Sequence, residues 1–111
     1  MKTNIDIENA VLGAILLDQS SLISVQYLLK YELFSDEKNQ MIYRAIDTLS
    51  KSGQKIDLLT ITVELKKTNC LDYVTAYYVS SLTNRVASSA NIVNHAAILN
   101  ELFMLRELEK I

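Results

Sequence analysis

Few residues of this 111-residue sequence have the types and the spacing that enzyme chemistry needs. His95 is its one histidine and Cys70 its one cysteine. Neither belongs to a metal-binding pattern such as H-E-x-x-H, and neither has the sequence partners of an activated nucleophile. A single histidine on a helix between apolar stripes is more often a packed or exposed bystander than a ligand. These two residues therefore predict no catalytic or metal site.

Three carboxylates have the positions of helix caps. Asp18, Asp57 and Asp72 each stand before a stretch of helical periodicity, where an aspartate accepts hydrogen bonds from the free N–H groups of the first turn. Capping explains all three better than acid–base catalysis does. A nucleotide-binding P-loop needs the pattern G-x-x-x-x-G-K-[ST], which does not occur, since the chain has only Gly13 and Gly53. We therefore expect this segment to be no enzyme and to bind no cofactor or metal.

Three tyrosines, Tyr73, Tyr77 and Tyr78, leave two interpretations open. Tyrosines stack on the bases of single-stranded nucleic acid, but they are also favoured in cores and protein interfaces. A phosphate-binding surface needs an excess of Lys and Arg, whereas this chain has 11 basic and 13 acidic residues and a formal charge of −2. The charge favours the core or a protein interface, and no direct nucleic-acid binding is expected.

The elements that position these residues are predicted to be helices. A β-sandwich or barrel needs a turn signal every 8–12 residues or so, and this sequence has no proline and two glycines. Half of the residues are hydrophobic, enough to form the core of one domain. The expected fold class is all-α.

Periodicity and capping residues predict six helices. The first is an almost entirely apolar block from Val11 to Leu17, in which Gly13 permits the close approach of a neighbouring helix. A short apolar connector from Tyr31 to Phe34 fills the core between the second and the third. The later helices are bounded as follows: Asp18 or Ser20 to Leu29, Ser35 to Gly53, Asp57 to Asn69, Asp72 to Asn84, and Ser88 or Ser89 to Ile111.

The last predicted helix has apolar residues on three sectors of its circumference. The sectors hold Ile92, Ala96, Leu99 and Phe103; Ile98, Leu102 and Leu105; and Val93, Ala97, Met104 and Leu108. A terminal helix in so small a domain cannot bury three sectors against its own chain, so a second chain or a following segment must cover part of it. The candidate partner interface consists of Ile98, Leu102, Phe103, Leu105 and Leu108.

The sequence predicts no membrane segment and a cytoplasmic location. The apolar stretch from Ala10 to Leu17 has about eight residues, against about 20 needed to cross a bilayer. Asp6 and Glu8 are acidic where a signal peptide would be basic. A single cysteine is compatible with a reducing compartment.

Five short segments occur in an order and spacing typical of one protein family. They are Glu8 to Asp18 (E-x-x-V-L-G-A-x-L-x-D), Leu33-Phe34, Met41 to Ile46, Gly53 to Ile61 (G-x-x-I-D-x-x-T-I), and Ser89 to Ile92 followed by Arg106. Together they resemble the N-terminal domain of bacterial replicative DNA helicases of the DnaB family, from about residue 5 to 108. Two places depart from the family pattern: Val74-Thr75 stand where a Gly-Gly is usual, and Asn39-Gln40 where a histidine is usual.

The resemblance implies a compact orthogonal bundle of about six helices whose last helix is the first arm of a helical hairpin. Residues 1–88 would form a helical globular head. Residues 89–111 would form the C-terminal helix that leads to a second hairpin arm and an ATPase domain, both absent from this segment. ATP and magnesium would belong to that ATPase domain.

The implied function is non-catalytic. Domains of this family form a dimer-based collar and help to dock primase and helicase-loading factors in DNA replication. The expected partners are therefore further copies of the chain, primase and the helicase loader. The alternative is a stand-alone phage- or plasmid-encoded protein of the same fold that binds a host helicase or primase.

Overall fold

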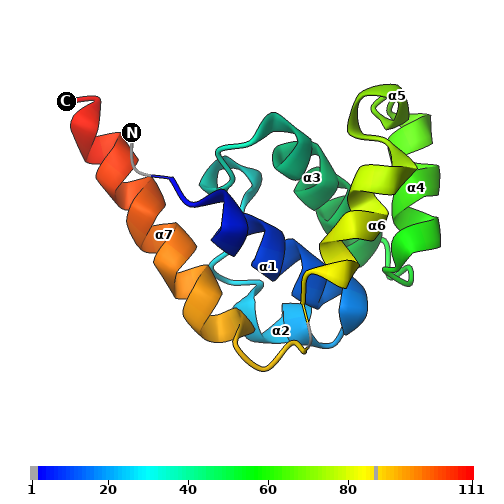
Figure 1. Cartoon of the computed structure of the whole chain (residues 1–111), viewed down its shortest axis with the longest axis horizontal. Coiled ribbons are helices and arrows are strands. Elements are labelled where there is room, and N and C mark those ends of the chain that lie inside the picture. Colours follow the sequence, from blue (N-terminus) through cyan, green and yellow to red (C-terminus); the bar gives the residue numbers. More distant parts are fainter. Residues whose placement is uncertain (1–2, 87) are drawn as a thin grey trace.

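Helices make up all the regular structure in the computed structural model, which describes residues 3–86 and 88–111 (Figure 1). Within these ranges the chain forms seven α-helices and one 3-10 helix and no strand, which confirms the all-α prediction. The elements are α1 (Ile5–Leu17), α2 (Ser21–Val25), η1 (Tyr31–Leu33), α3 (Glu37–Lys51), α4 (Leu58–Lys67), α5 (Leu71–Val74), α6 (Ala76–Asn84) and α7 (Ile92–Glu109).

Helix α1 is the centre of the globule. It contacts α2, α3, α6 and α7, and Val11, Leu12 and Ile15 are completely buried. A helix that is apolar around most of its circumference is normally covered from several sides. The helix begins six residues earlier than the apolar block, at Ile5, because the Asn4 side chain accepts a hydrogen bond from the backbone of Ile7.

Helices α1 and α6 approach each other closely at Gly13. A Cβ atom at this position would collide with the carbonyl oxygen of Leu82 in α6 and with the side chain of Val86. The predicted reason for a glycine inside this helix, close packing of a neighbour, is confirmed.

Helices α3 and α4 have strong caps. Asp57 accepts from the N–H of Thr60 at 2.9 Å, and the Thr60 hydroxyl accepts from the N–H of Asp57 at 2.9 Å, which completes a capping box. The hydrogen bond from the Thr60 backbone lowers the pKa of Asp57. The predicted cap of α3, Ser35, is wrong: Asp36 accepts from Lys38 N at 2.8 Å instead.

The connector before α3 lies in the core, as predicted. Leu33 and Phe34 are completely buried, and the ring of Phe34 stacks on that of Tyr43 with 5.4 Å between centroids. Burial, reinforced by the nearby charge of Asp47, raises the pKa of Tyr43 to about 12.

The helix predicted from Asp72 to Asn84 is two helices. The backbone turns at Thr75, whose φ of 71° ends α5, and the Thr75 hydroxyl then accepts from Tyr78 N to begin α6. Asp72 lies in the first turn of α5 and Cys70 precedes that helix, so the predicted cap is wrong. Helix α4 ends at Lys67, and the chain turns at Asn69, where φ is 62°, so that Cys70 lies immediately before α5.

The last helix starts later than predicted. Helix α7 begins at Ile92 after Asn91, and neither Ser88 nor Ser89 caps it. The Ser89 hydroxyl instead donates to Asp18 at 3.1 Å, and the hydroxyls of Ser20 and Ser89 lower the pKa of Asp18.

Candidate protein interface on helix α7

Helix α7 lies along one edge of the molecule (Figure 1). It contacts α1, α2 and η1. Ile92, Ala96 and Leu99 are buried against these elements, and Phe103 packs against the same core while remaining half-buried. One of the three predicted apolar sectors therefore faces the chain's own core.

Two side chains fix the C-terminal half of α7 to the connector η1. Arg106 donates to the carbonyl oxygens of Glu32 at 3.4 Å and Leu33 at 3.2 Å. The ammonium group of Lys30 lies 4.5 Å from the centre of the Phe103 ring, within the range of a cation–π interaction. These contacts connect the C-terminal half of α7 to residues 30–33.

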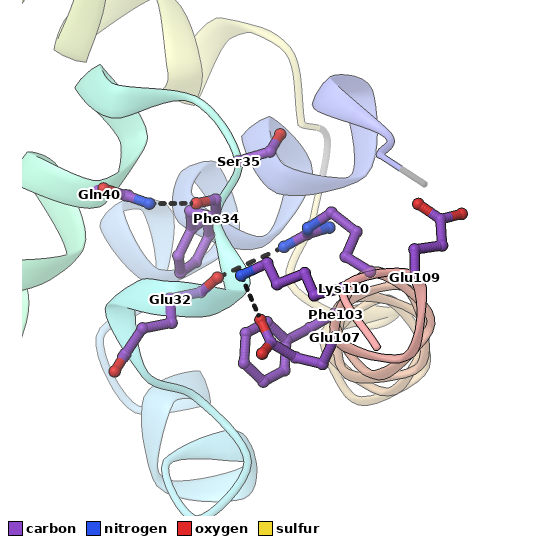
Figure 2. Close-up of a pocket in the computed structure, with 9 residues that line it drawn as sticks. Glu32, Phe34, Ser35, Gln40, Phe103, Glu107, Glu109 and Lys110 are labelled. Carbon is purple, nitrogen blue, oxygen red and sulfur yellow. Dashed lines mark hydrogen bonds and ion pairs between the residues drawn. The ribbon is translucent and has the colours of Figure 1, made fainter. Parts of the chain in front are cut away.

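An open groove of about 680 Å³ runs between η1 and the end of α7. Figure 2 shows Phe103, Glu107 and Lys110 on the α7 side and Phe34 and Gln40 on the other. Gln40 donates to the carbonyl oxygen of Phe34 at 2.7 Å, and Lys110 pairs with Glu107 at 2.9 Å. The side chains of Gln40, Glu107 and Lys110 are thus partnered within the chain.

The other sectors of α7 leave apolar side chains in solvent. Val93 is 49% exposed, Met104 57% and Leu108 63%. Ala97 is also exposed. Isolated exposed hydrophobic residues are common, but a row of them along one helix is typical of an interaction site.

The five predicted interface residues do not have one environment. Leu105 and Leu108 are exposed, Ile98 and Leu102 are half-buried, and Phe103 belongs to the core of its own chain. Their role in a partner interface stays a prediction, as does the division into a head of residues 1–88 and a helix of residues 89–111. Val93, Ala97 and Met104 share a predicted sector with Leu108 but are not among the five predicted interface residues.

A buried polar cluster, which sequence reasoning missed, connects α1 with the start of α3. The Glu8 carboxylate is completely buried. It accepts from Ser35 N at 2.9 Å, from the Ser35 hydroxyl at 2.5 Å, from Asp36 N at 3.3 Å and from the Asn39 amide at 3.1 Å. These donors stand at the N-terminus of α3, where the helix dipole favours an anion. The acidic residue shortly before the apolar block of α1 was the available signal.

The cluster continues to α6 through Tyr78. The Tyr78 hydroxyl donates to Asn39 at 2.7 Å, and the Asn39 amide donates to Asn9 at 3.0 Å. Burial raises the pKa of Tyr78. The described side chains include no buried nitrogen or oxygen that lacks a hydrogen-bond partner, so the cluster is a structural link between helices.

The other residues considered for chemistry lie apart from one another. Cys70 is half-buried between α4 and α5, and its thiol is 3.6 Å from the carbonyl oxygen of Thr68. His95 is on α7. Tyr73 and Tyr77 are exposed. The residues described here contain no group of three His, Cys, Asp or Glu side chains arranged to hold a metal ion.

No helix in the described ranges is long and apolar enough to cross a membrane.

These features define a class of protein. The described residues form an all-α globule whose buried polar side-chain atoms are hydrogen-bonded and whose edge helix, α7, exposes apolar side chains. Residues 1–101 match the family model of the DnaB-like helicase N terminal domain. The chain is 40% identical over 106 residues to the replicative DNA helicase DnaB of Rhodothermus marinus, covering 95% of this chain and 11% of that protein. It is 39% identical over 106 residues to the replicative DNA helicase DnaC of Bacillus subtilis (strain 168), covering 95% of this chain and 23% of that protein.

A solved structure has the same fold. The crystal structure of the N-terminal domain of DnaB helicase from Mycobacterium tuberculosis superposes with a TM-score of 0.94 at 29% identity, covering 98% of this chain and 76% of that one. The chain therefore belongs to the DnaB-like helicase N-terminal domain family. It spans less than a quarter of the length of the two helicases named above.

Proposed function

We propose that this chain is the non-catalytic domain of a replicative DNA helicase, and that it forms oligomers through α7. The observation that carries the proposal is the row of exposed apolar side chains on α7, which its own chain leaves uncovered. The family membership and the helicases that it resembles support the assignment to DNA replication.

We further propose that the domain contributes to docking primase and helicase-loading factors. ATP and magnesium would bind in another domain of the complete protein, since this segment has no P-loop sequence. The formal charge of −2 supports a protein-binding role over a direct grip on DNA phosphates.

Sedimentation velocity over a rising concentration of the 111-residue chain tests self-association. The expected result is a sedimentation coefficient that increases with concentration, because apolar area on α7 becomes buried between copies. A strictly monomeric profile at high concentration would contradict the proposal.

Aspartate substitutions separate folding from association. Phe103→Asp is expected to lower the free energy of unfolding, since the ring contacts the core and Lys30. Leu108→Asp changes a side chain that is 63% exposed and should weaken association with little effect on unfolding. Leu102→Asp, at a half-buried position, should disturb both.

A pull-down with the primase C-terminal domain tests the docking role, and an ATPase assay on the same preparation tests the non-catalytic role. The proposal is supported if the tagged chain retains primase and an excess of untagged chain reduces that retention. Failure to retain primase at concentrations where the chain is folded, or hydrolysis of ATP above background, would contradict the non-catalytic docking function.

A further inference from the structure

A second groove, of about 600 Å³, lies between α2 and residues 50–56, and we call it the α2 groove. None of its lining residues belongs to α7. Its apolar part consists of Leu22, Ile23 and Ile56. Leu22 and Ile56 are buried, whereas Ile23 is 77% exposed. The groove is therefore a concave site with an apolar centre, separate from the candidate interface on α7.

Two hydrogen bonds connect the walls of the α2 groove. The side-chain oxygen of Gln19 accepts from the backbone N–H of Ile56 at 2.9 Å, and the Gln26 amide donates to the Ser50 hydroxyl at 3.3 Å. These bonds join residues that are 37 and 24 positions apart in the chain. A site whose walls are already fixed costs less conformational entropy when a ligand binds.

Polar groups at the α2 groove are left without partners among the described residues. They are the side-chain nitrogen of Gln19, the side-chain oxygen of Gln26 and the backbone N–H of Lys55. A carboxamide can both donate and accept hydrogen bonds. Amide donors and acceptors beside an apolar centre match the backbone and the side chains of an extended peptide.

The surface around the α2 groove is uncharged over a long stretch. The eleven residues from Gln19 to Leu29 include no Asp, Glu, Lys, Arg or His. Tyr27, one helical turn after Ile23, is 78% exposed, and tyrosine is enriched in protein interfaces. Lys55 is the one charged residue that lines the groove. An uncharged surface is covered by an apolar partner at a lower desolvation cost than a charged one.

We propose that the α2 groove binds an extended segment of a partner protein, uncharged around one apolar side chain and with an acidic residue at one end. The apolar side chain packs against Ile23 and Ile56, and the backbone forms hydrogen bonds with Gln19 and Gln26. The acidic residue pairs with Lys55. This site is independent of the proposed self-association through α7.

An extended segment fits the α2 groove better than a helix does. The backbone N–H and C=O groups of a helix are already paired within the helix, so they would leave the free amide groups of Gln19 and Gln26 unused. One short segment in an open groove buries less area than a standard interface. We therefore expect a dissociation constant of about 0.1–1 mM for a heptapeptide.

Selection from a library of random heptapeptides, displayed in many copies on each phage, tests the chemistry of the occupant. Multivalent display retains weak binders. The 111-residue chain should enrich peptides that carry Leu, Ile, Val or Met in an uncharged stretch beside Asp or Glu, and the Ile23→Asp variant should not. The proposal would be overturned by enrichment of basic peptides, of the same peptides on both proteins, or of none.

A matched pair of serine substitutions locates the site. Ile23→Ser and Val63→Ser each remove an apolar side chain that is 77% or 49% exposed, but only Ile23 lines the α2 groove. Fluorescence anisotropy with the most enriched peptide should show about tenfold weaker binding for Ile23→Ser and no change for Val63→Ser. Urea unfolding checks that both variants are folded. Equal effects of the two substitutions would contradict the proposed site.

A charge exchange tests the acidic end of the segment. Lys55→Glu should weaken binding of the selected peptide about tenfold, and it should strengthen binding of the same peptide with lysine in place of the acidic residue. The gain for the second peptide cannot come from a folding defect. Equal losses for both peptides would overturn the pairing with Lys55.

Methylation of the backbone nitrogens of the selected peptide, one at a time, tests the contact with Gln26. At least one N-methyl group should weaken binding about tenfold, because it removes a donor to the Gln26 side chain. The same N-methyl group should matter less in the Gln26→Leu variant, which has no acceptor there. Backbone recognition would be contradicted if no position were sensitive, or if the sensitivity were the same in both proteins.

Two variants separate this inference from the proposed self-association. Leu108→Lys, on α7, should bind the selected peptide with unchanged affinity, and Ile23→Ser should sediment as the wild type does. A chain that binds the peptide but stays monomeric would contradict the self-association alone. If Ile23→Ser reduced self-association, the occupant of the groove would be a second copy of this chain, and the proposed partner segment would be wrong.

Discussion

The interior of the molecule holds a buried charged residue, whereas the outer face of α7 holds exposed apolar residues. Inside, the carboxylate of Glu8 is completely buried; outside, Met104 and Leu108 are more than half exposed. Every polar atom of the interior cluster has partners within the chain, but the outer face of α7 has no such cover. The difference separates two tasks: the buried polar groups specify how the helices meet, and the exposed apolar groups are available to another molecule.

The largest expected effect is at the interior. Glu8→Ala would remove the acceptor of the part-buried donors of Ser35 and Asp36 and one of the two acceptors of the buried Asn39 amide, at about 1–3 kcal/mol for each group that water does not reach. We expect the free energy of unfolding in urea to fall by about 3 kcal/mol or more. Glu8→Gln keeps the shape and should cost less. The structural role of the buried carboxylate would be contradicted if Glu8→Ala lowered the free energy of unfolding no more than Glu109→Ala does at an exposed position.

A larger side chain should lower the free energy of unfolding more at the buried contact between α1 and α6 than on the exposed side of α7. Gly13→Ala introduces a Cβ against the backbone of Leu82, so α1 and α6 must separate, at a cost of about 1–3 kcal/mol. Ala97→Leu adds three carbons on the exposed side of α7 and should change unfolding by less than about 0.5 kcal/mol. Thermal unfolding at low protein concentration measures the stability of both variants. If both lost the same stability relative to the wild type, α1 and α6 would have room to adjust.

Removing the Asp57 cap of α4 should lower the free energy of unfolding by a smaller amount, and this effect should depend on pH. Asp57→Ala should cost about 1 kcal/mol at pH 7. The folded-state pKa of Asp57 is lowered from 3.8 by the Thr60 hydrogen bond, so the ionised carboxylate stabilises the fold above the unfolded pKa, and this contribution is lost as the pH falls through the folded pKa. The difference between wild type and variant should therefore shrink below about pH 4. Asp57→Asn, a cap without charge, should show no such pH dependence.

The smallest effect on folding is expected on the outer face. Leu108→Lys should change the free energy of unfolding by less than about 0.5 kcal/mol, because the side chain is already 63% exposed. Urea titration below the association range provides the measurement. A loss comparable to that of Gly13→Ala would show that Leu108 supports the head and is no free surface.

Local rules predicted much of the fold from the sequence. The apolar block of α1, the reason for a glycine within it and the Asp57 cap all follow from spacing within one or two helical turns. The break at Thr75 does not, because helical periodicity continues across it and threonine seldom adopts a φ of 71°. A Gly-Gly, which is usual at this place in the family, would have signalled the turn.

The polar cluster was beyond local rules for a different reason. Its members are separated by up to 70 positions, from Glu8 to Tyr78, and their hydrogen bonds depend on how three helices pack. Asn39, near the place where the family usually has a histidine, donates to both Glu8 and Asn9. For the candidate interface, the sequence predicted a last helix that its own chain covers only in part. Which sector of that helix faces outward depends on how α7 packs against α1, α2 and η1.

The attachment of α7 has a mechanical consequence. Arg106 holds the carbonyl groups of Glu32 and Leu33, and Ser35, two residues further along the chain, donates to Glu8. The end of α7 is therefore connected to the start of α3 and to the buried carboxylate through residues 32–35. A displacement of this end of α7 would have to break these hydrogen bonds or move residues 32–35 with it.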